Sequence, residues 1–347
     1  MILTESPAAP HLRLLLEPLM PWLGDSATEE IAINKPGEVW VRQRGAFTRY
    51  DLPPDLQDLK SIAVLAGALR RQDVGDSRPL LAAELPDGER LQVCLFPVVP
   101  HGTISLTIRK PGSSVVPLAD AEKRYDTAEW NSAKETRRSR DMEYLLALYS
   151  AGDLNGFFER CVRSRLNILL TGATGSGKST LAKSLVAAID PEERLITIED
   201  VRELDVTQPN HVRLLFQRDD ADDRAIDAET LLQTCLRMRP DRVFLAEIRG
   251  AEAWTYVTGV MPPHPGSIST IHGQSAGSAF RRLFALCKSS RDGASLDDRT
   301  LSVLLADVID VVVPLREDHG SFAISGVWFV GDAQRRGQSA AALLQEE

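Results

Sequence analysis

The chain has 347 residues, of which 43% are hydrophobic and 26% are charged, values typical of folded globular proteins. This composition excludes collagen-like, low-complexity and disordered classes, and at roughly 100 to 200 residues per domain the length predicts two domains. The net charge of −9 provides no general basic surface, so we expect contact with nucleic acid to be local or indirect at most.

The cysteines and the N-terminal apolar stretch exclude further classes. The four cysteines are far apart and form no Cys-x-x-Cys pair, which argues against a zinc ribbon or a disulfide framework and suits a reducing cytosol. Residues 12–23 are apolar but are interrupted by Arg13, Glu17, Pro18 and Pro21, so they form neither a spanning helix nor a signal-peptide core. We expect a protein that is soluble, or peripheral to a membrane at most.

The first 110 residues predict an α+β N-terminal domain. Alternating apolar residues indicate strands, and a period of three to four residues indicates one helix. The expected elements are strands at 31–33 and 38–41 with a turn at 34–37, a helix at 56–71, and strands at 91–99 and 103–109.

A linker and a second domain follow. Prolines and then a charged run mark residues 111–140 as a linker or solvated helix. From residue 141 two helices are expected, at 142–149 and 154–163, and strand, loop and helix then alternate. This alternation predicts an α/β domain over 141–335 with a mainly parallel sheet and helices on both faces, and residues 336–347 are expected to form a flexible tail.

A phosphate-binding loop is the strongest motif in the chain. The apolar run 167–170 is followed by Gly172-Ala173-Thr174-Gly175-Ser176-Gly177-Lys178-Ser179, and a helix-compatible stretch begins at Thr180. Glycines let backbone N–H groups turn toward phosphate oxygens, and the following helix directs its positive end at the same charge. We therefore expect residues 172–180 to bind a nucleotide triphosphate, with Lys178 at the β and γ phosphates and the Ser179 hydroxyl on Mg²⁺.

Hydrolysis also needs carboxylates that orient water, and these are expected where parallel strands end. The strand-like run 194–198 ends in Glu199 and Asp200, and the run 242–246 ends in Glu247. We expect Glu247 to serve the attacking water or the water shell of the metal, and Glu199 to assist. The alternative for Glu247 is a structural ion pair with Arg249.

Two histidines flank another short strand. His272 ends the run 267–271, and His264 precedes it. An imidazole at the end of a sheet strand can hydrogen-bond a γ-phosphate, so we expect a functional role for His272. For His264 a role as an ordinary core or surface residue is equally consistent with the sequence.

In this order the motifs resemble those of the secretion ATPases, and most closely those of the type IV secretion ATPases. An acidic box is similar to residues 196–200, a Walker B region to 236–250 and a histidine box to 264–272. Residues 16–19, 30–41 and 106–111 resemble the N-terminal domain of the type IV members. The chain departs from the family pattern at Ala246, at Pro262-Pro263 and at Gly273-Gln274, which alter loops but leave the reactive side chains in place.

The resemblance implies a RecA-like P-loop domain, ATP with Mg²⁺ as cofactor, and catalytic roles for Lys178, Glu247, Glu199 and His272. It implies a hexameric ring that is cytoplasmic and peripheral on the inner membrane, where it powers assembly of the apparatus or pilus and transfer of protein or DNA. Other secretion-system ATPases and inner-membrane components are the implied partners. Arginines are expected to complete the charge stabilisation; the candidates are Arg109, Arg202, Arg249, Arg281 and Arg282.

Two alternatives remain open from the sequence. One is a nucleotide-dependent switch or scaffold with little turnover, which docks partners in its occupied state. The other is a type II secretion or pilus motor of the same superfamily. The scattered cysteines argue against the tetracysteine zinc insert that type II assembly ATPases usually carry.

Overall fold

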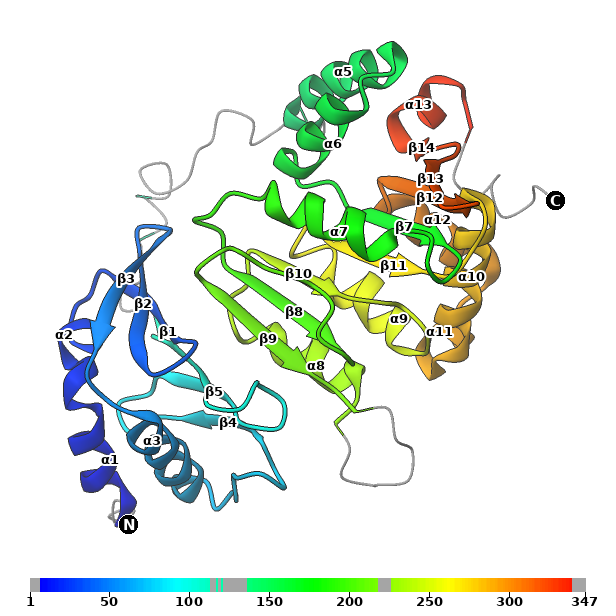
Figure 1. Ribbon diagram of the computed structural model, residues 1–347. Coiled ribbons are helices and arrows are strands. Elements are labelled where there is room, and N and C mark those ends of the chain that lie inside the picture. Colours follow the sequence, from blue (N-terminus) through cyan, green and yellow to red (C-terminus); the bar gives the residue numbers. More distant parts are fainter. Residues whose placement is uncertain (1–6, 113–116, 118–119, 121–135, 218–225, 339–347) are drawn as a thin grey trace.

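The computed structural model of the chain describes residues 7–112, 117, 120, 136–217 and 226–338. For residues 136–140 it describes the backbone alone. Its elements divide into an N-terminal group and a C-terminal group (Figure 1). The N-terminal elements are α1 (Ala8–Leu16), η1 (Glu17–Leu19), α2 (Met20–Leu23), β1 (Thr28–Ile33), β2 (Gly37–Gln43), β3 (Ala46–Leu52), α3 (Leu56–Leu69), β4 (Leu80–Glu84), β5 (Arg90–Cys94) and β6 (Ser105–Arg109).

The C-terminal group begins with two helices and continues with alternating strands and helices. Its elements are α5 (Thr136–Ala151), α6 (Leu154–Arg163), β7 (Ile168–Gly172), α7 (Lys178–Ala187), β8 (Leu195–Glu199), β9 (His211–Leu215), α8 (Ala228–Cys235), β10 (Arg242–Leu245), α9 (Glu252–Thr255), η3 (Tyr256–Val260), β11 (Ile268–Ile271), α10 (Ala276–Ser289), α11 (Arg291–Ser295), α12 (Asp298–Val308), β12 (Val311–Asp318), β13 (Ser321–Ile324), β14 (Trp328–Phe329) and α13 (Val330–Arg335).

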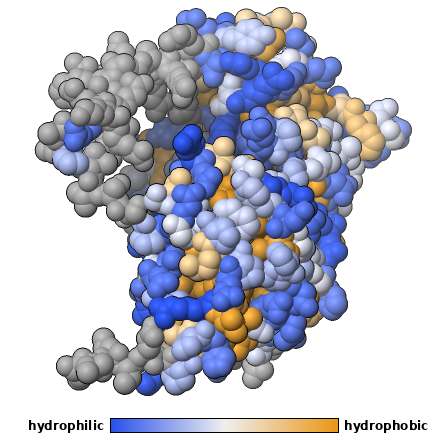
Figure 2. All heavy atoms as spheres, turned by 90° about the vertical axis from the view of Figure 1, so that its left-hand side faces the viewer, coloured by the Kyte–Doolittle hydropathy of each residue, from blue (hydrophilic) through white to orange (hydrophobic). Residues whose placement is uncertain are grey.

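The N-terminal sheet is antiparallel and has the order β3-β2-β1-β6-β5-β4. Residues 12–23, which the sequence excludes as a spanning helix, form α1, η1 and α2, and their leucines pack with those of α3 in one core. The Asp55 side chain caps α3 by accepting hydrogen bonds from the N–H groups of Gln57 and Asp58. On the face shown in Figure 2, hydrophilic residues break the apolar surface into separate areas.

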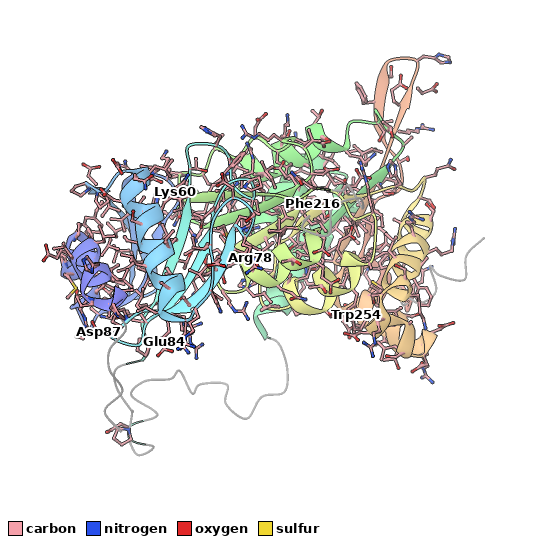
Figure 3. The ribbon with its side chains drawn as sticks, turned by 90° about the horizontal axis from the view of Figure 1, so that it is seen from below. Lys60, Arg78, Glu84, Asp87, Phe216 and Trp254 are labelled. Carbon is pink, nitrogen blue, oxygen red and sulfur yellow. The ribbon has the colours of Figure 1, made fainter. Side chains whose placement is uncertain are left out.

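The C-terminal strands run mainly parallel, as the sequence predicts. β8 pairs with β10 and β9, and β7 pairs with β11 and β12, all in parallel. The last strands, β13 and β14, pair antiparallel with β12. Seen from below, the hairpin of β12 and β13 extends beyond the body of the molecule (Figure 3).

Successive residues of the C-terminal strands enter different cores, because side chains alternate between the two faces of a sheet. Ile168 and Leu170 of β7 pack in the core with α5, α6 and α7, whereas Leu169 packs in the core with α8, α9, α10 and α12. Strands that are apolar on both faces are typical of a parallel sheet covered by helices. The expected mixed α/β class is confirmed.

The two groups of elements meet at a buried polar contact. The Arg194 guanidinium has no exposed surface and donates to Asn34 Oδ1 at 2.8 Å, to Asn210 Oδ1 at 2.5 Å and to the Met238 carbonyl at 3.0 Å. Because Asn34 follows β1 and the other partners belong to the C-terminal group, this arginine joins the N-terminal group to the C-terminal group. Burial is the main cause that lowers its pKa to about 10.

One strand expected from the sequence is too long, and the ends of several other expected elements differ from those observed. The strand expected at 91–99 ends at Cys94, because Pro97 lacks the N–H that a continuing strand needs and Val98 N closes a turn on the Leu95 carbonyl. Helix α5 begins at Thr136, within the expected linker, most of which lies outside the described residues, as do residues 339–347 of the expected tail.

All four cysteines are buried and none is in a disulfide. Burial raises the pKa of each thiol, to about 12 for Cys94 and Cys287. In the part of the chain that the structure describes, no helix combines the length and the apolar character that a membrane crossing requires.

Candidate functional site

The expected phosphate loop connects β7 to α7. Strand β7 is buried along its whole length between β11 and β12. Gly177 has a φ of +89°, a left-handed conformation that residues with a side chain rarely adopt, and α7 begins at the next residue. The loop therefore delivers the N-terminal end of a helix to the carboxyl edge of the sheet, which is the geometry that binds anions.

Lys178 lies inside the loop rather than in solvent. Its Nζ donates hydrogen bonds to the carbonyls of Gly172 at 2.8 Å and Ala173 at 2.7 Å, and the residue is 9% exposed. Burial is the largest cause that lowers its pKa, and the Glu247 carboxylate opposes this effect. The ammonium group is thus held where phosphate oxygens are expected.

Ser179 meets a carboxylate that the sequence analysis did not single out. Its hydroxyl donates to Glu203 Oε2 at 3.0 Å, and Glu203 belongs to the loop that follows β8. The available signal was the position of Glu203, four residues after the parallel strand β8, because ligands in open α/β proteins bind at the carboxyl ends of parallel strands.

Glu247 lies where β10 ends and contacts two expected residues. Its Oε2 pairs with Arg249, and its Oε1 lies 2.9 Å from His272 Nε2. Arg249 Nη1 lies 3.6 Å from Asp200, and the hydrogen bond to Glu247 is the largest cause that raises the pKa of Arg249. The ion pair with Arg249 is therefore present, and the catalytic role of Glu247 stays a prediction.

Glu199 is fully buried and its carboxylate faces protein groups. Oε1 accepts from the N–H groups of Glu203 at 3.0 Å and Leu204 at 2.7 Å, and Oε2 lies 2.8 Å from Arg213 Nε. Glu199 thus fixes the start of the loop that carries Glu203. This geometry favours an indirect role for Glu199, and a direct catalytic role stays a prediction.

The two histidines lie at opposite edges of the sheet. His272 directly follows β11, beside the Glu247 carboxylate. His264 precedes β11, and the charged groups that affect its pKa are Arg239, Asp241 and Arg165. The pKa of His264 is lowered, mainly by burial. The structure therefore brings His272 to the candidate site and leaves His264 away from it.

Of the candidate arginines, Arg249 contacts Glu247. Arg109 is on β6, 3.6 Å from Glu30 in the N-terminal sheet. Arg202 is exposed in the loop after β8, and Arg281 and Arg282 are exposed on α10.

The loop region has unused hydrogen-bonding groups that suit a polar ligand. Among the described residues, the buried hydroxyls of Ser176 and Thr171 have no hydrogen-bond partner. The Ser179 hydroxyl and the Glu203 carboxylate supply oxygen ligands, which Mg²⁺ prefers. Within the described ranges no three His, Cys, Asp or Glu side chains form a metal cage, and nucleotide-bound Mg²⁺ usually relies on phosphates and water instead.

Two further features limit the space around the loop. A Cβ on Gly177 would lie 3.3 Å from the ring of Phe322, which is 66% exposed on the β12–β13 hairpin. A Cβ on Gly273 would lie 2.6 Å from Thr171 Oγ1, so this departure from the family pattern allows α10 to begin close to β7.

Comparisons with known proteins show the family of the chain. A model of the family described as "Type II/IV secretion system protein" matches residues 16–315. Protein VirB11 of Agrobacterium fabrum (strain C58 / ATCC 33970) is 53% identical over 340 residues, covering 97% of this chain and 99% of that protein. Type IV secretion system protein VirB11 of Brucella suis biovar 1 (strain 1330) is 39% identical over 327 residues, covering 92% and 90% of the two chains.

The crystal structure of the VirB11 ATPase from the Brucella suis type IV secretion system, in complex with sulphate, matches with a TM-score of 0.86. The identity is 37%, and the match covers 98% of each chain. These comparisons confirm the resemblance to the type IV members and favour it over the scaffold and type II alternatives. The chain therefore belongs to the type II/IV secretion system protein family and is a traffic ATPase of a type IV secretion system.

Proposed function

We propose that this chain hydrolyses ATP at the loop of residues 172–180, with Lys178, Glu247 and His272 as catalytic residues and Ser179 toward Mg²⁺. The observation that carries the proposal is the proximity of these side chains. His272, after β11, lies 2.9 Å from Glu247, after β10, and the Glu247 carboxylate acts on the pKa of Lys178, the first residue of α7. The segments that carry them follow the carboxyl ends of parallel strands, as expected of a nucleotide site in an open α/β protein.

The proposed chemistry assigns a distinct task to each group. Lys178 exchanges its bonds to the Gly172 and Ala173 carbonyls for phosphate oxygens and neutralises their charge. The Glu247 carboxylate orients the attacking water and accepts its proton. Arg249 pairs with Glu247 Oε2 and His272 Nε2 lies 2.9 Å from Glu247 Oε1, so that these two side chains flank the carboxylate.

Mg²⁺, when bound with the nucleotide, would offset the charge that develops on the phosphate oxygens. Ser179 is placed to hold it, and Glu203 holds the Ser179 hydroxyl by accepting its hydrogen bond. Glu199 supports this arrangement through the backbone N–H groups at the start of the Glu203 loop.

Two substitutions test the catalytic proposal. Lys178→Ala should abolish ATP binding and phosphate release, and Glu247→Gln should leave ATP bound but reduce phosphate release by about a hundredfold. Lys183→Ala is the matched control, because Lys183 is on the same helix but pairs with Asp205 at 3.0 Å on its surface. Phosphate release at the wild-type rate from either of the first two variants would exclude the mechanism.

The larger assembly is also a proposal. We propose a hexameric ring, cytoplasmic and peripheral on the inner membrane, that works with other secretion-system ATPases and inner-membrane components. It would power assembly of the apparatus or pilus and transfer of protein or DNA, with any nucleic-acid contact local. The proposed domains are 1–110 and 141–335, with a linker at 111–140 and a tail at 336–347. The mass of the purified assembly with and without ATP tests the ring, and a monomer under both conditions would contradict it.

A further inference from the structure

Strands β10 and β11 carry Glu247 and His272, yet their backbones scarcely pair. Within the described residues their ladder consists of one isolated bridge between Glu247 and Thr270, where Ile248 N donates to the Thr270 carbonyl at 2.9 Å. Over the rest of their length the two strands belong to separately paired sheets, β10-β8-β9 and β11-β7-β12-β13. Side chains must therefore satisfy the backbone groups of β10 that face β11.

Hydroxyl groups on β11, and on the residue before it, form hydrogen bonds with these backbone groups of β10. Each donates to a backbone carbonyl on the β10 side, and all of the donors are at least nine-tenths buried. The bonds run from Ser267 Oγ to Val243 O at 2.8 Å, from Ser269 Oγ to Leu245 O at 2.5 Å and from Thr270 Oγ1 to Ala246 O at 2.9 Å.

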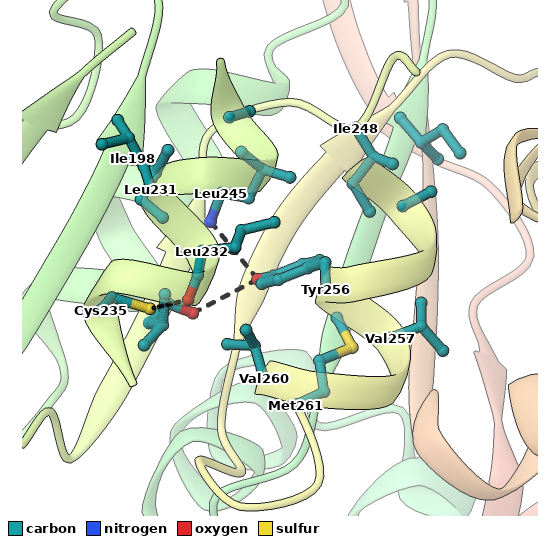
Figure 4. Packing of buried hydrophobic residues seen from close by; sticks show 14 of the residues in the cluster. Ile198, Leu231, Leu232, Cys235, Leu245, Ile248, Tyr256, Val257, Val260 and Met261 are labelled. Atoms are coloured by element: carbon teal, nitrogen blue, oxygen red, sulfur yellow. Dashed lines mark hydrogen bonds between the residues drawn. The ribbon is translucent and has the colours of Figure 1, made fainter. Parts of the chain in front are cut away.

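Tyr256 reaches the same contact from η3, and hydrogen bonds with Ser267 and Ser269 are among the causes that act on the pKa of its hydroxyl. Its hydroxyl accepts from Leu245 N at 3.4 Å and donates to Val243 O at 3.3 Å (Figure 4). The residue has no exposed surface, and burial raises the pKa of its hydroxyl to about 12, so it stays a neutral donor. We call the four residues Tyr256, Ser267, Ser269 and Thr270 the hydroxyl seam.

The hydroxyl seam divides the candidate site. On one side, β8 and β10 lead to Glu203 and Glu247; on the other, β7 and β11 lead to the phosphate loop and His272. The contacts across the site, between Glu247 and His272 and between Ser179 and Glu203, each join one side to the other. The distance from the water-orienting carboxylate to the phosphates therefore depends on how the two sides are held together.

We propose that the hydroxyls of Tyr256, Ser267 and Ser269 are positioning residues for ATP hydrolysis, because they set the spacing between the strand that carries Glu247 and the strands that carry the phosphate loop and His272. This inference rests on the proposed function. None of the three hydroxyls contacts the nucleotide site; they act through the backbone of β10. A misplacement of about 1 Å in a catalytic group can cost about a hundredfold in rate, so a partial shift should be measurable.

A pair of variants isolates the hydroxyl. Ser269→Thr keeps it and Ser269→Val removes it, while both add the same branched bulk. We expect Ser269→Val to lower kcat about tenfold relative to Ser269→Thr, with the KM for ATP within about twofold, since the phosphate loop itself is unchanged. Ser105→Val is a distant control, because Ser105 is a buried serine of the N-terminal sheet whose hydroxyl has no hydrogen-bond partner among the described residues.

Tyr256→Phe provides a second test that removes a hydroxyl without adding bulk, should Ser269→Val not fold. We expect a several-fold loss of kcat, again with little change in KM. A residue that only stabilises the fold would lower the melting temperature and leave kcat per nucleotide-binding site unchanged. Equal kcat for Ser269→Val and Ser269→Thr, or wild-type kcat for a folded Tyr256→Phe, would overturn the inference. Absence of turnover in the unaltered chain would instead overturn the proposed function, and the inference with it.

Discussion

His211 should make the stability of this protein depend on pH. It is the first residue of β9, and its Nε2 lies 3.0 Å from the Thr197 hydroxyl, which donates to the buried Glu199 at 3.2 Å. Because the single hydroxyl hydrogen of Thr197 is directed at Glu199, the neutral imidazole is the donor to Thr197. Burial, with smaller contributions from Arg213 and Arg194, lowers the pKa of His211 to about 3.

The sign and size of the effect follow from linkage. In the unfolded chain His211 titrates at about 6.5, so below that pH it is protonated in the unfolded state and stays neutral in the folded state. Its contribution to the free energy of unfolding is thus complete above pH 6.5 and is lost as pH falls toward the folded value of about 3. Between pH 7 and pH 5 the loss from this one group is about 2 kcal/mol.

Urea unfolding at the two pH values measures this loss. His211→Gln keeps an N–H donor but cannot titrate, so the difference in stability between pH 7 and pH 5 should shrink by about 2 kcal/mol. Glu30, whose pKa burial raises, is present in both proteins and cancels in the comparison. His319→Gln, at an exposed residue, is the matched substitution outside the core. An identical pH dependence in wild type and His211→Gln would refute the reasoning.

Three other predictions concern the loop and its surroundings. Asn167→Ala removes acceptors for Gly266 N and Ser267 N and a donor to the Val308 carbonyl, and should lower stability in urea by about 3 kcal/mol; an unchanged midpoint would contradict this. Gly273→Ala should lower the melting temperature, at a cost of about 1–3 kcal/mol, whereas Gly75→Ala, with open space at its Cβ, should not. Glu203→Gln should raise the Mg²⁺ concentration needed for half-maximal phosphate release about tenfold. An unchanged Mg²⁺ dependence would show that Glu203 does not contribute to the Mg²⁺ site.

Much of the site was predictable because its signals are local. The glycines and Lys178 of the loop form a contiguous pattern, and Glu247 directly follows an apolar run, so neither depends on distant parts of the chain. His272 was predictable for the same reason, since it directly follows the short apolar run that forms β11. Strand β7 and helix α7 were likewise indicated by apolar residues next to the loop.

The parts that escaped prediction depend on contacts between distant segments. Glu203 is one of several carboxylates after β8, and what distinguishes it is the Ser179 hydroxyl 24 residues earlier. Glu199 was expected at the site, but the N–H groups of its own loop and Arg213 occupy its oxygens. No spacing rule indicates that Arg194 joins the C-terminal group to the N-terminal group through Asn34, because that hydrogen bond spans 160 residues.

The burial of all four cysteines has a practical consequence. A thiol reacts with maleimides only as an accessible thiolate, and burial both hides these sulfurs and raises their pKa. A cysteine introduced at exposed His319, on the tip of the β12–β13 hairpin, would therefore be the one that takes up a dye. The natural chain thus needs no removal of a native cysteine before a dye is attached to the hairpin.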